Sequence, residues 1–149
     1  MHMSDDAKVA KELVETLKDG ERGFTSAAEK LRDSDRAEWA TTLQRLAEQR
    51  AGFRREIVEM GHEYGDDVDE SGSVAATLHR GWISLKDALT GDDAGSVLGA
   101  AATGEEHAVS EYEKGLEQDL SAGFREVVSR QHAAVVAARD EVKALQTAD

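Results

Sequence analysis

Residues 9–31 read VAKELVETLKDGERGFTSAAEKL, and this stretch decides the fold. Its apolar residues recur at intervals of three and four, from Leu13 through Phe24 to Leu31, which is the period of one face of an α-helix. One carboxylate, Glu21, lies at the edge of this face and close to two glycines. The stretch therefore predicts a long amphipathic helix with a polar residue near its middle.

The same period recurs along the rest of the chain. We expect five helices, which cover approximately residues 5–31, 35–63, 72–89, 93–118 and 122–146. The sequence contains no proline, which fits long uninterrupted helices. No segment alternates polar and apolar residues as a half-buried strand does. The sequence therefore predicts an all-α fold.

The connections predict how these helices are arranged. A few residues around Ser34 join the first two helices, and a few residues before Ser121 join the last two, so each pair is expected to form an antiparallel hairpin. The shorter helix over residues 72–89 would carry the chain back along the bundle between the hairpins. This predicts a four-helix bundle with an additional helix in its crossover, which is the connectivity of ferritin-like proteins. A plain up-and-down bundle is the alternative.

The composition excludes several classes of protein. The chain has 149 residues, with 31 acidic and 18 basic side chains and a formal net charge of −13, and its length predicts one domain. Such a charge argues against nucleic acid and anionic membranes as partners. The absence of cysteine excludes disulfides, thiolate nucleophiles and cysteine-ligated metals.

The sequence also carries expectations about location and domain limits. No stretch approaches the roughly 20 apolar residues of a membrane span, and no signal peptide is visible. We therefore expect a cytoplasmic protein. Residues 1–3 look like a cloning remnant, and residues 4–149 are taken as a single domain.

Polar residues interrupt the apolar faces of the four long helices. Counting a rise of about 1.5 Å per residue from each turn places these residues near one cross-section, halfway along the bundle. The residues expected in this layer are Glu21, Gln49 or Arg50, Glu105, and Gln131 or His132.

One interpretation of this layer is a metal site. Glu21 and Glu105 would be carboxylate ligands and His132 an imidazole ligand, a donor set that suits iron or manganese. The two-metal sites of such bundles use Glu-x-x-His pairs, and Ser129 stands where this pair would need a glutamate. The match is therefore partial.

The other interpretation is a metal-free structural or interaction protein. In this case Arg50 neutralises Glu21 and Glu105 in a buried layer that fixes the register of the helices. A ligand pocket beside Gly20, Gly23 and Gly104 is the third alternative.

The last helix is rich in alanine, and small side chains occur on more than one of its faces. This pattern is compatible with a homodimer contact through the segment. The alanines concerned are Ala133, Ala134, Ala137 and Ala138.

Several segments resemble a known family of small bacterial proteins of unknown function, classed as ferritin-like four-helix bundles. They are DGERGF at residues 19–24, GSVA at 72–75, LHRGWISLK at 78–86 and ALTG at 88–91. The resemblance covers nearly the whole chain and implies the ferritin-like fold. It does not imply an activity, because the family is largely uncharacterised. Its ferritin-like neighbours include iron-binding and stress-associated proteins, and their ligands match Glu21 and Glu105 well and His132 in part. Iron or manganese binding, with a role in stress protection, is therefore one expected function.

Overall fold

The computed structural model describes residues 4–63 and 94–147 of the chain. Within these residues the helices are α1 (Asp6–Arg32), α2 (Ala37–Glu63), α5 (Ala94–Leu116) and α6 (Ala122–Thr147). Each of the four begins and ends within two residues of the bounds predicted from the sequence. The helix expected over residues 72–89, in the crossover, lies outside the described residues.

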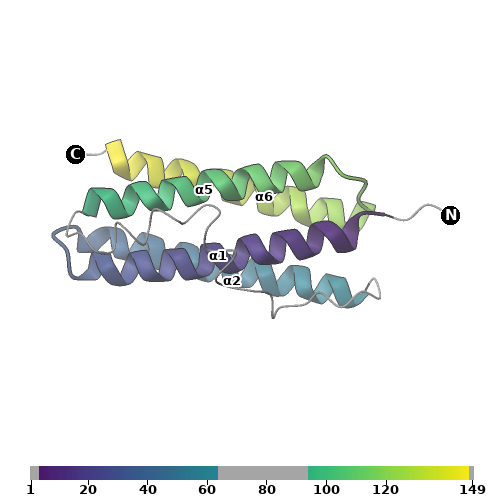
Figure 1. The fold of residues 1–149 in the computed structure, drawn as a ribbon, viewed down its shortest axis with the longest axis horizontal. Helices are drawn as coiled ribbons and strands as arrows, with labels where there is room; N and C mark the ends of the chain where they lie inside the picture. The colour runs from purple at the N-terminus through teal and green to yellow at the C-terminus, as the bar shows by residue number, and fades with distance from the viewer. Residues whose placement is uncertain (1–3, 64–93, 148–149) are drawn as a thin grey trace.

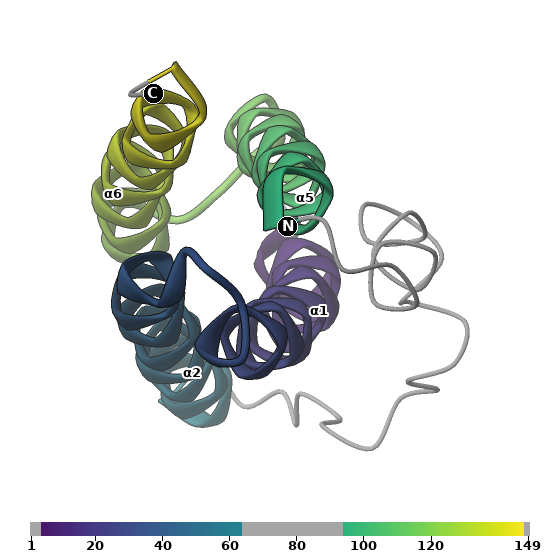
Figure 2. The same cartoon turned by 90° about the vertical axis from the view of Figure 1, so that its left-hand side faces the viewer.

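The four helices form an elongated bundle. Seen along its axis in Figure 2, the helices follow one another around a square in the order α1, α2, α6, α5. In Figure 1 the colour shows that α1 and α6 run in one direction, and that α2 and α5 run in the other. Every neighbouring pair is therefore antiparallel, while α2 and α5 are parallel across the diagonal. This is the predicted hairpin–crossover–hairpin connectivity, and it differs from a plain up-and-down bundle.

Two apolar clusters fill the interior of the bundle. One lies toward the α1–α2 turn and contains Phe24, Leu31 and Trp39. The other lies toward the α5–α6 turn and contains Leu13 and Phe124. Each fully buried Leu or Phe side chain contributes about 1.5–3 kcal/mol through removal of apolar surface from water. The clusters stabilise the two ends, and the polar residues lie between them.

The start of α1 is fastened to the turn between α5 and α6. The carboxylate of Asp6 accepts hydrogen bonds from the backbone N–H of Ser121 at 2.9 Å and from its hydroxyl at 2.6 Å. The backbone N–H of Asp5 donates to the carbonyl oxygen of Asp119 at 2.7 Å. These bonds hold the two hairpins in register at one end. None of the described helices has the combination of length and hydrophobicity needed to cross a membrane.

Candidate functional site

The centre of the bundle is occupied by an ion pair between Arg50 of α2 and Glu105 of α5. The guanidinium donates two hydrogen bonds, from Nη1 to Oε1 at 2.5 Å and from Nη2 to Oε2 at 2.8 Å. The exposed fractions of the two side chains are 1% and 0%. Because α2 and α5 face each other across the diagonal, this pair ties the two hairpins together through the interior.

The remaining contacts of Arg50 account for the types of residue that surround it. Its Nε donates to Oε1 of Gln49 at 3.1 Å, and its guanidinium lies over the ring of Phe24 at 5.2 Å from the centroid. A Cβ atom at Gly20 would lie 3.3 Å from Cγ of Arg50. The glycine in the middle of α1 therefore makes room for the arginine. The space that the sequence assigned to a ligand beside Gly20 holds this side chain.

Burial controls the electrostatics of Glu105. Removal from water raises the pKa of the carboxyl group above its ordinary value, and the charge and hydrogen bonds of Arg50 oppose that rise. A carboxylate and a guanidinium that are both buried need each other, because either one left alone would be an uncompensated charge in a low-dielectric interior.

Glu21 is separate from this pair. About a third of its side chain is exposed, and its Oε2 accepts a hydrogen bond from Nη2 of Arg54 at 3.1 Å. The metal-free interpretation assigned Arg50 to both carboxylates. The structure gives Arg50 to Glu105 and a different arginine to Glu21. The cause is helical geometry, since Glu21 is one residue after Gly20 and is turned away from the axis by about 100°.

Gln131 and His132 belong to a second level of the bundle. The hydroxyl of Tyr112 donates to Oε1 of Gln131 at 2.6 Å, and Nε2 of Gln131 donates to Oε1 of Glu56 at 2.8 Å. Tyr112 lies seven residues after Glu105 on the same helix (112 − 105 = 7), a rise of about 10 Å. The single cross-section predicted from the sequence is therefore two polar levels, about two helical turns apart.

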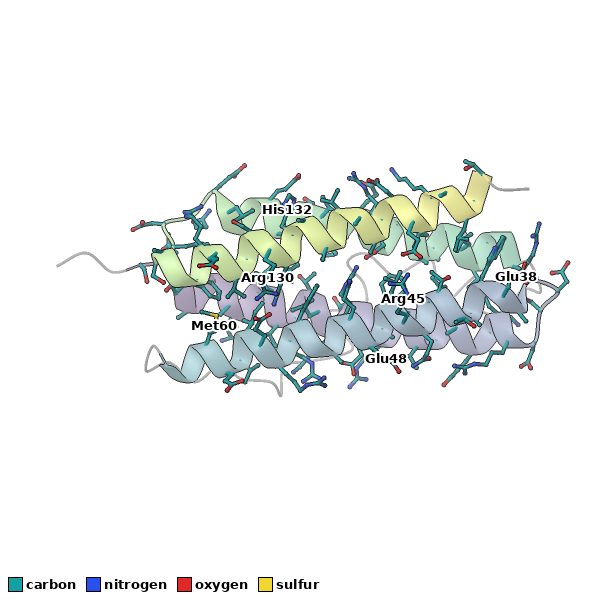
Figure 3. The ribbon with its side chains drawn as sticks, turned by 180° about the vertical axis from the view of Figure 1, so that it is seen from behind. Glu38, Arg45, Glu48, Met60, Arg130 and His132 are labelled. Carbon is teal, nitrogen blue, oxygen red and sulfur yellow. The ribbon has the colours of Figure 1, made fainter. Side chains whose placement is uncertain are left out.

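His132 lies at the edge of this second level. A quarter of its side chain is exposed, and its Nε2 is 3.5 Å from a carboxylate oxygen of Glu113. It is on the side of α6 turned away from α2 (Figure 3). The adjacent Gln131 takes the interior position. The structure does not bring His132, Glu21 and Glu105 together.

The network around Tyr112 was not expected as a unit. Tyr112 is fully buried, and burial raises the pKa of its hydroxyl far above the ordinary value, so it stays a proton donor to Gln131. Glu56 also pairs with Arg130. The sequence offered a signal for Gln131, which stands seven residues after Phe124, but none for Glu56, which is off the apolar face of its helix.

The described residues do not fit the metal site that the fold suggests. Among the side chains described in residues 4–60 and 94–147, no three of His, Asp or Glu gather closely enough to hold a metal ion. Both oxygens of Glu105 accept hydrogen bonds from a guanidinium, which already supplies the positive charge that a metal would bring. A divalent cation at Glu105 would have to displace that cation from a buried position.

A shallow depression of about 350 Å³ lies on the first half of α2, beside the end of α1. Its two arginines are engaged: Arg32 donates to Gln44 at 3.1 Å, and Arg45 donates to Glu141 at 2.5 Å. The depression therefore holds no uncommitted guanidinium that would fix an anion.

These features define the class of protein. The fold is similar to that of a Mycobacterium smegmatis Dps1 mutant, with a TM-score of 0.84, 14% sequence identity and 95% of each chain covered. At this identity the likeness concerns the fold, which is ferritin-like. Residues 6–118 match the family described as "Domain of unknown function (DUF2383)", and the chain belongs to this family. No curated protein matches it.

Proposed function

We propose that the chain is a metal-free member of the ferritin-like fold that acts as a structural or protein-interaction module, in the cytoplasm. The observation that carries this proposal is the buried, bidentate pair of Arg50 and Glu105 at the centre of the bundle. In this position the protein uses a guanidinium as its internal cation. The polar layer then serves the register and pairing of the two hairpins.

Three further observations support the proposal. Glu21 has its own partner, Arg54, and His132 lies near Glu113 on a side of α6 away from the centre. The space left by the missing side chain at Gly20 is filled by Arg50 and not left for an ion. Glu21 and His132, which were expected to complete a metal site with Glu105, thus have other neighbours.

The experiment compares metal uptake by matched variants. The purified chain, without an affinity tag, is incubated with Mn(II), or with Fe(II) under anaerobic conditions, then desalted and analysed for metal. We expect no stoichiometric metal in the wild type and the same result in Glu21→Gln, Glu105→Gln and His132→Ala. Circular dichroism of each variant checks that the bundle is folded.

The competing function is an iron- or manganese-binding protein, with a role in stress protection, that uses Glu21, Glu105 and His132. It requires Glu105 to exchange Arg50 for a metal ion. Near-stoichiometric metal in the wild type that disappears in Glu105→Gln and Glu21→Gln would establish this function and overturn the metal-free proposal. Oxidase activity toward Fe(II) would then be the next measurement.

A homodimer through α6 is the interaction that the chain itself suggests. Ala133 and Ala137 are exposed on the outer side of α6, while Ala134 is half-buried and Ala138 is buried. We expect Ala137→Arg to shift the mass measured by light scattering toward the monomer. Thr103→Arg, at an exposed position of α5, is the matched control and should leave the mass unchanged. A monomeric wild type would contradict the dimer.

A further inference from the structure

The edge between α2 and α6 differs from the other three edges of the bundle. The backbones of its two helices approach each other closely at few positions, whereas those of α1–α2, α5–α6 and α1–α5 do so at many more. The α1–α5 contact is so close that a Cβ atom at Gly115 would lie 2.9 Å from Cγ1 of Val9. The two hairpins are therefore joined tightly along one edge and loosely along the opposite one.

The ion pairs and hydrogen bonds across the loose edge join polar side chains at its rim, outside the apolar clusters. Arg45 of α2 pairs with Glu141 of α6, and Glu56 of α2 pairs with Arg130 of α6. Both arginines are seen between the two helices in Figure 3. In addition, Nε2 of Gln131 donates to the backbone carbonyl oxygen of Phe53 at the long distance of 3.4 Å.

The two ion pairs follow from one sequence pattern. On α2 the glutamate comes eleven residues after the arginine (56 − 45 = 11), and on α6 the spacing is the same (141 − 130 = 11). Because the helices are antiparallel, each arginine meets the glutamate of the other helix. The pairs are about 16 Å apart along the edge.

These pairs hold the edge weakly. The exposed fractions are 54% and 42% for Arg45 and Glu141, and 55% and 36% for Arg130 and Glu56. Exposed pairs of this kind are well solvated and screened by salt, so they contribute little to the free energy of folding.

Midway along this edge, between the two apolar clusters, the interior is also polar. Gln49 is half-buried and contacts Arg50, which in turn is paired with Glu105 across the diagonal. Separation of α2 from α6 would admit water to this layer. Hydration of two buried charges offsets part of the loss of their mutual attraction, which an apolar layer could not do.

We propose that the bundle opens along the α2–α6 edge, with the α1–α5 contact as the hinge and the Arg50–Glu105 pair as the interior latch. The open form is a minor population that salt increases. It exposes the central polar layer and the adjoining parts of the two apolar clusters, while each hairpin stays intact. The opening is a property of the fold and does not depend on the proposed function.

The absence of cysteine from the 149 residues allows spin labels to be attached only at introduced cysteines. Labels at Glu48→Cys and Ala137→Cys report on the α2–α6 edge, and labels at Glu29→Cys and Thr41→Cys report on the α1–α2 edge. All four positions are exposed. Pulsed electron–electron double resonance then gives the distance distribution for each pair of labels. It is measured in low salt and in about 1 M salt, where the Debye length is about 3 Å.

We expect a second, longer distance across α2–α6 that grows with salt, and a single unchanged distance across α1–α2. In the labelled background, Arg45→Glu should enlarge the longer population in low salt, because it places two carboxylates together. The exchange Arg45→Glu with Glu141→Arg should restore the shorter distance. A single α2–α6 distance under every condition would overturn the proposal, and so would equal broadening across both edges.

Discussion

At the scale of single residues, the most informative position is Arg50. It combines full burial with two hydrogen bonds to Glu105, one to Gln49 and a place over the ring of Phe24. Each of the three guanidinium nitrogens donates one of these hydrogen bonds. A lysine could not reproduce this arrangement, because the planar fork of arginine matches the two oxygens of a carboxylate.

Replacement of Arg50 should make stability depend on pH in an unusual direction. Arg50→Met removes the charge that lowers the pKa of Glu105, so burial raises this pKa further. Above 4.5, the ordinary value, the unfolded chain has lost this proton while the folded variant still holds it. The stability contributed by the proton is therefore complete below 4.5 and is lost as the pH rises toward the raised pKa. We expect a loss of about 1.4 kcal/mol per pH unit in that window.

Urea unfolding of Arg50→Met between about pH 5 and pH 7 measures this slope. The control is Arg50→Met with Glu105→Gln, which keeps the shape of the site but has no carboxyl group to titrate. The difference between the two curves isolates Glu105 from the many other acids of the chain. Parallel curves would show that Glu105 is ionised in the variant and that water reaches the site.

Alanine substitutions at two glycines distinguish the effect of close helix packing from the effect of helix propensity. At Gly115 a Cβ atom would lie 2.9 Å from Val9, a buried residue of α1, so Gly115→Ala should destabilise by about 1–3 kcal/mol through overpacking. At Gly52 the nearest atom would be the mobile end of Arg55 at 3.9 Å, so Gly52→Ala should stabilise by up to about 1 kcal/mol. Thermal unfolding of both variants tests the pair. Equal shifts in the same direction would contradict the close α1–α5 contact.

The candidate site could be predicted from sequence only in part. Glu105 was predicted because a glutamate on an apolar face is rare, and the interior position of the second helix was narrowed to Gln49 or Arg50. The choice between Gln131 and His132 could not be made, since a rotation of α6 by about 100° exchanges them. No pattern in the sequence pointed to Glu56, because the polar group that it contacts, Gln131, belongs to another helix.

At the scale of elements, α6 begins with a capping group that comes from a distant segment. Ser121 precedes α6, and its N–H and hydroxyl both donate to Asp6 at the start of α1. A carboxylate here satisfies a free N–H and interacts favourably with the helix dipole. The contact links the ends of both hairpins, so its effect should reach beyond one helix.

Asp6→Ala should lower the free energy of unfolding by about 1–2 kcal/mol and increase hydrogen exchange in the first turn of α6. Asp6→Asn keeps an acceptor oxygen and should lose less. Chemical denaturation, together with amide hydrogen exchange measured at Phe124 and Arg125, distinguishes the two variants. If alanine and asparagine behave like the wild type, the contact to Ser121 is not maintained in solution.

The helices were the easiest elements to predict. Long apolar faces without proline leave few alternatives, and the bounds of α1, α2, α5 and α6 deviate from expectation by two residues at most. The antiparallel hairpins followed from short connections. The lateral contacts did not, because the spacing of arginine and glutamate along α2 and α6 becomes meaningful only when the two helices are known to be neighbours.

At the scale of the whole molecule, some interaction must favour the ferritin-like arrangement over other packings of the same two hairpins. Two antiparallel hairpins with broad apolar faces can slide by a helical turn or exchange partners at small cost. A buried pair between α2 and α5 penalises such arrangements, because each of them would leave Arg50 or Glu105 buried alone. In this view the pair contributes specificity and little net stability.

The double variant Arg50→Met with Glu105→Leu tests this view of the pair. Arg50→Met alone should cost about 3–5 kcal/mol at neutral pH, because Glu105 must take up a proton or stay charged without a partner. Glu105→Leu alone should cost a similar amount, because it leaves the charge of Arg50 uncompensated. The double variant fills the layer with apolar groups and should be as stable as the wild type, or up to about 4 kcal/mol more stable. Urea unfolding of the four proteins gives the coupling energy, and the number of backbone resonances reports uniqueness. Additional resonances in a stable double variant would identify register as the role of the pair. A double variant as unstable as the single ones would instead show that the ion pair itself stabilises the bundle.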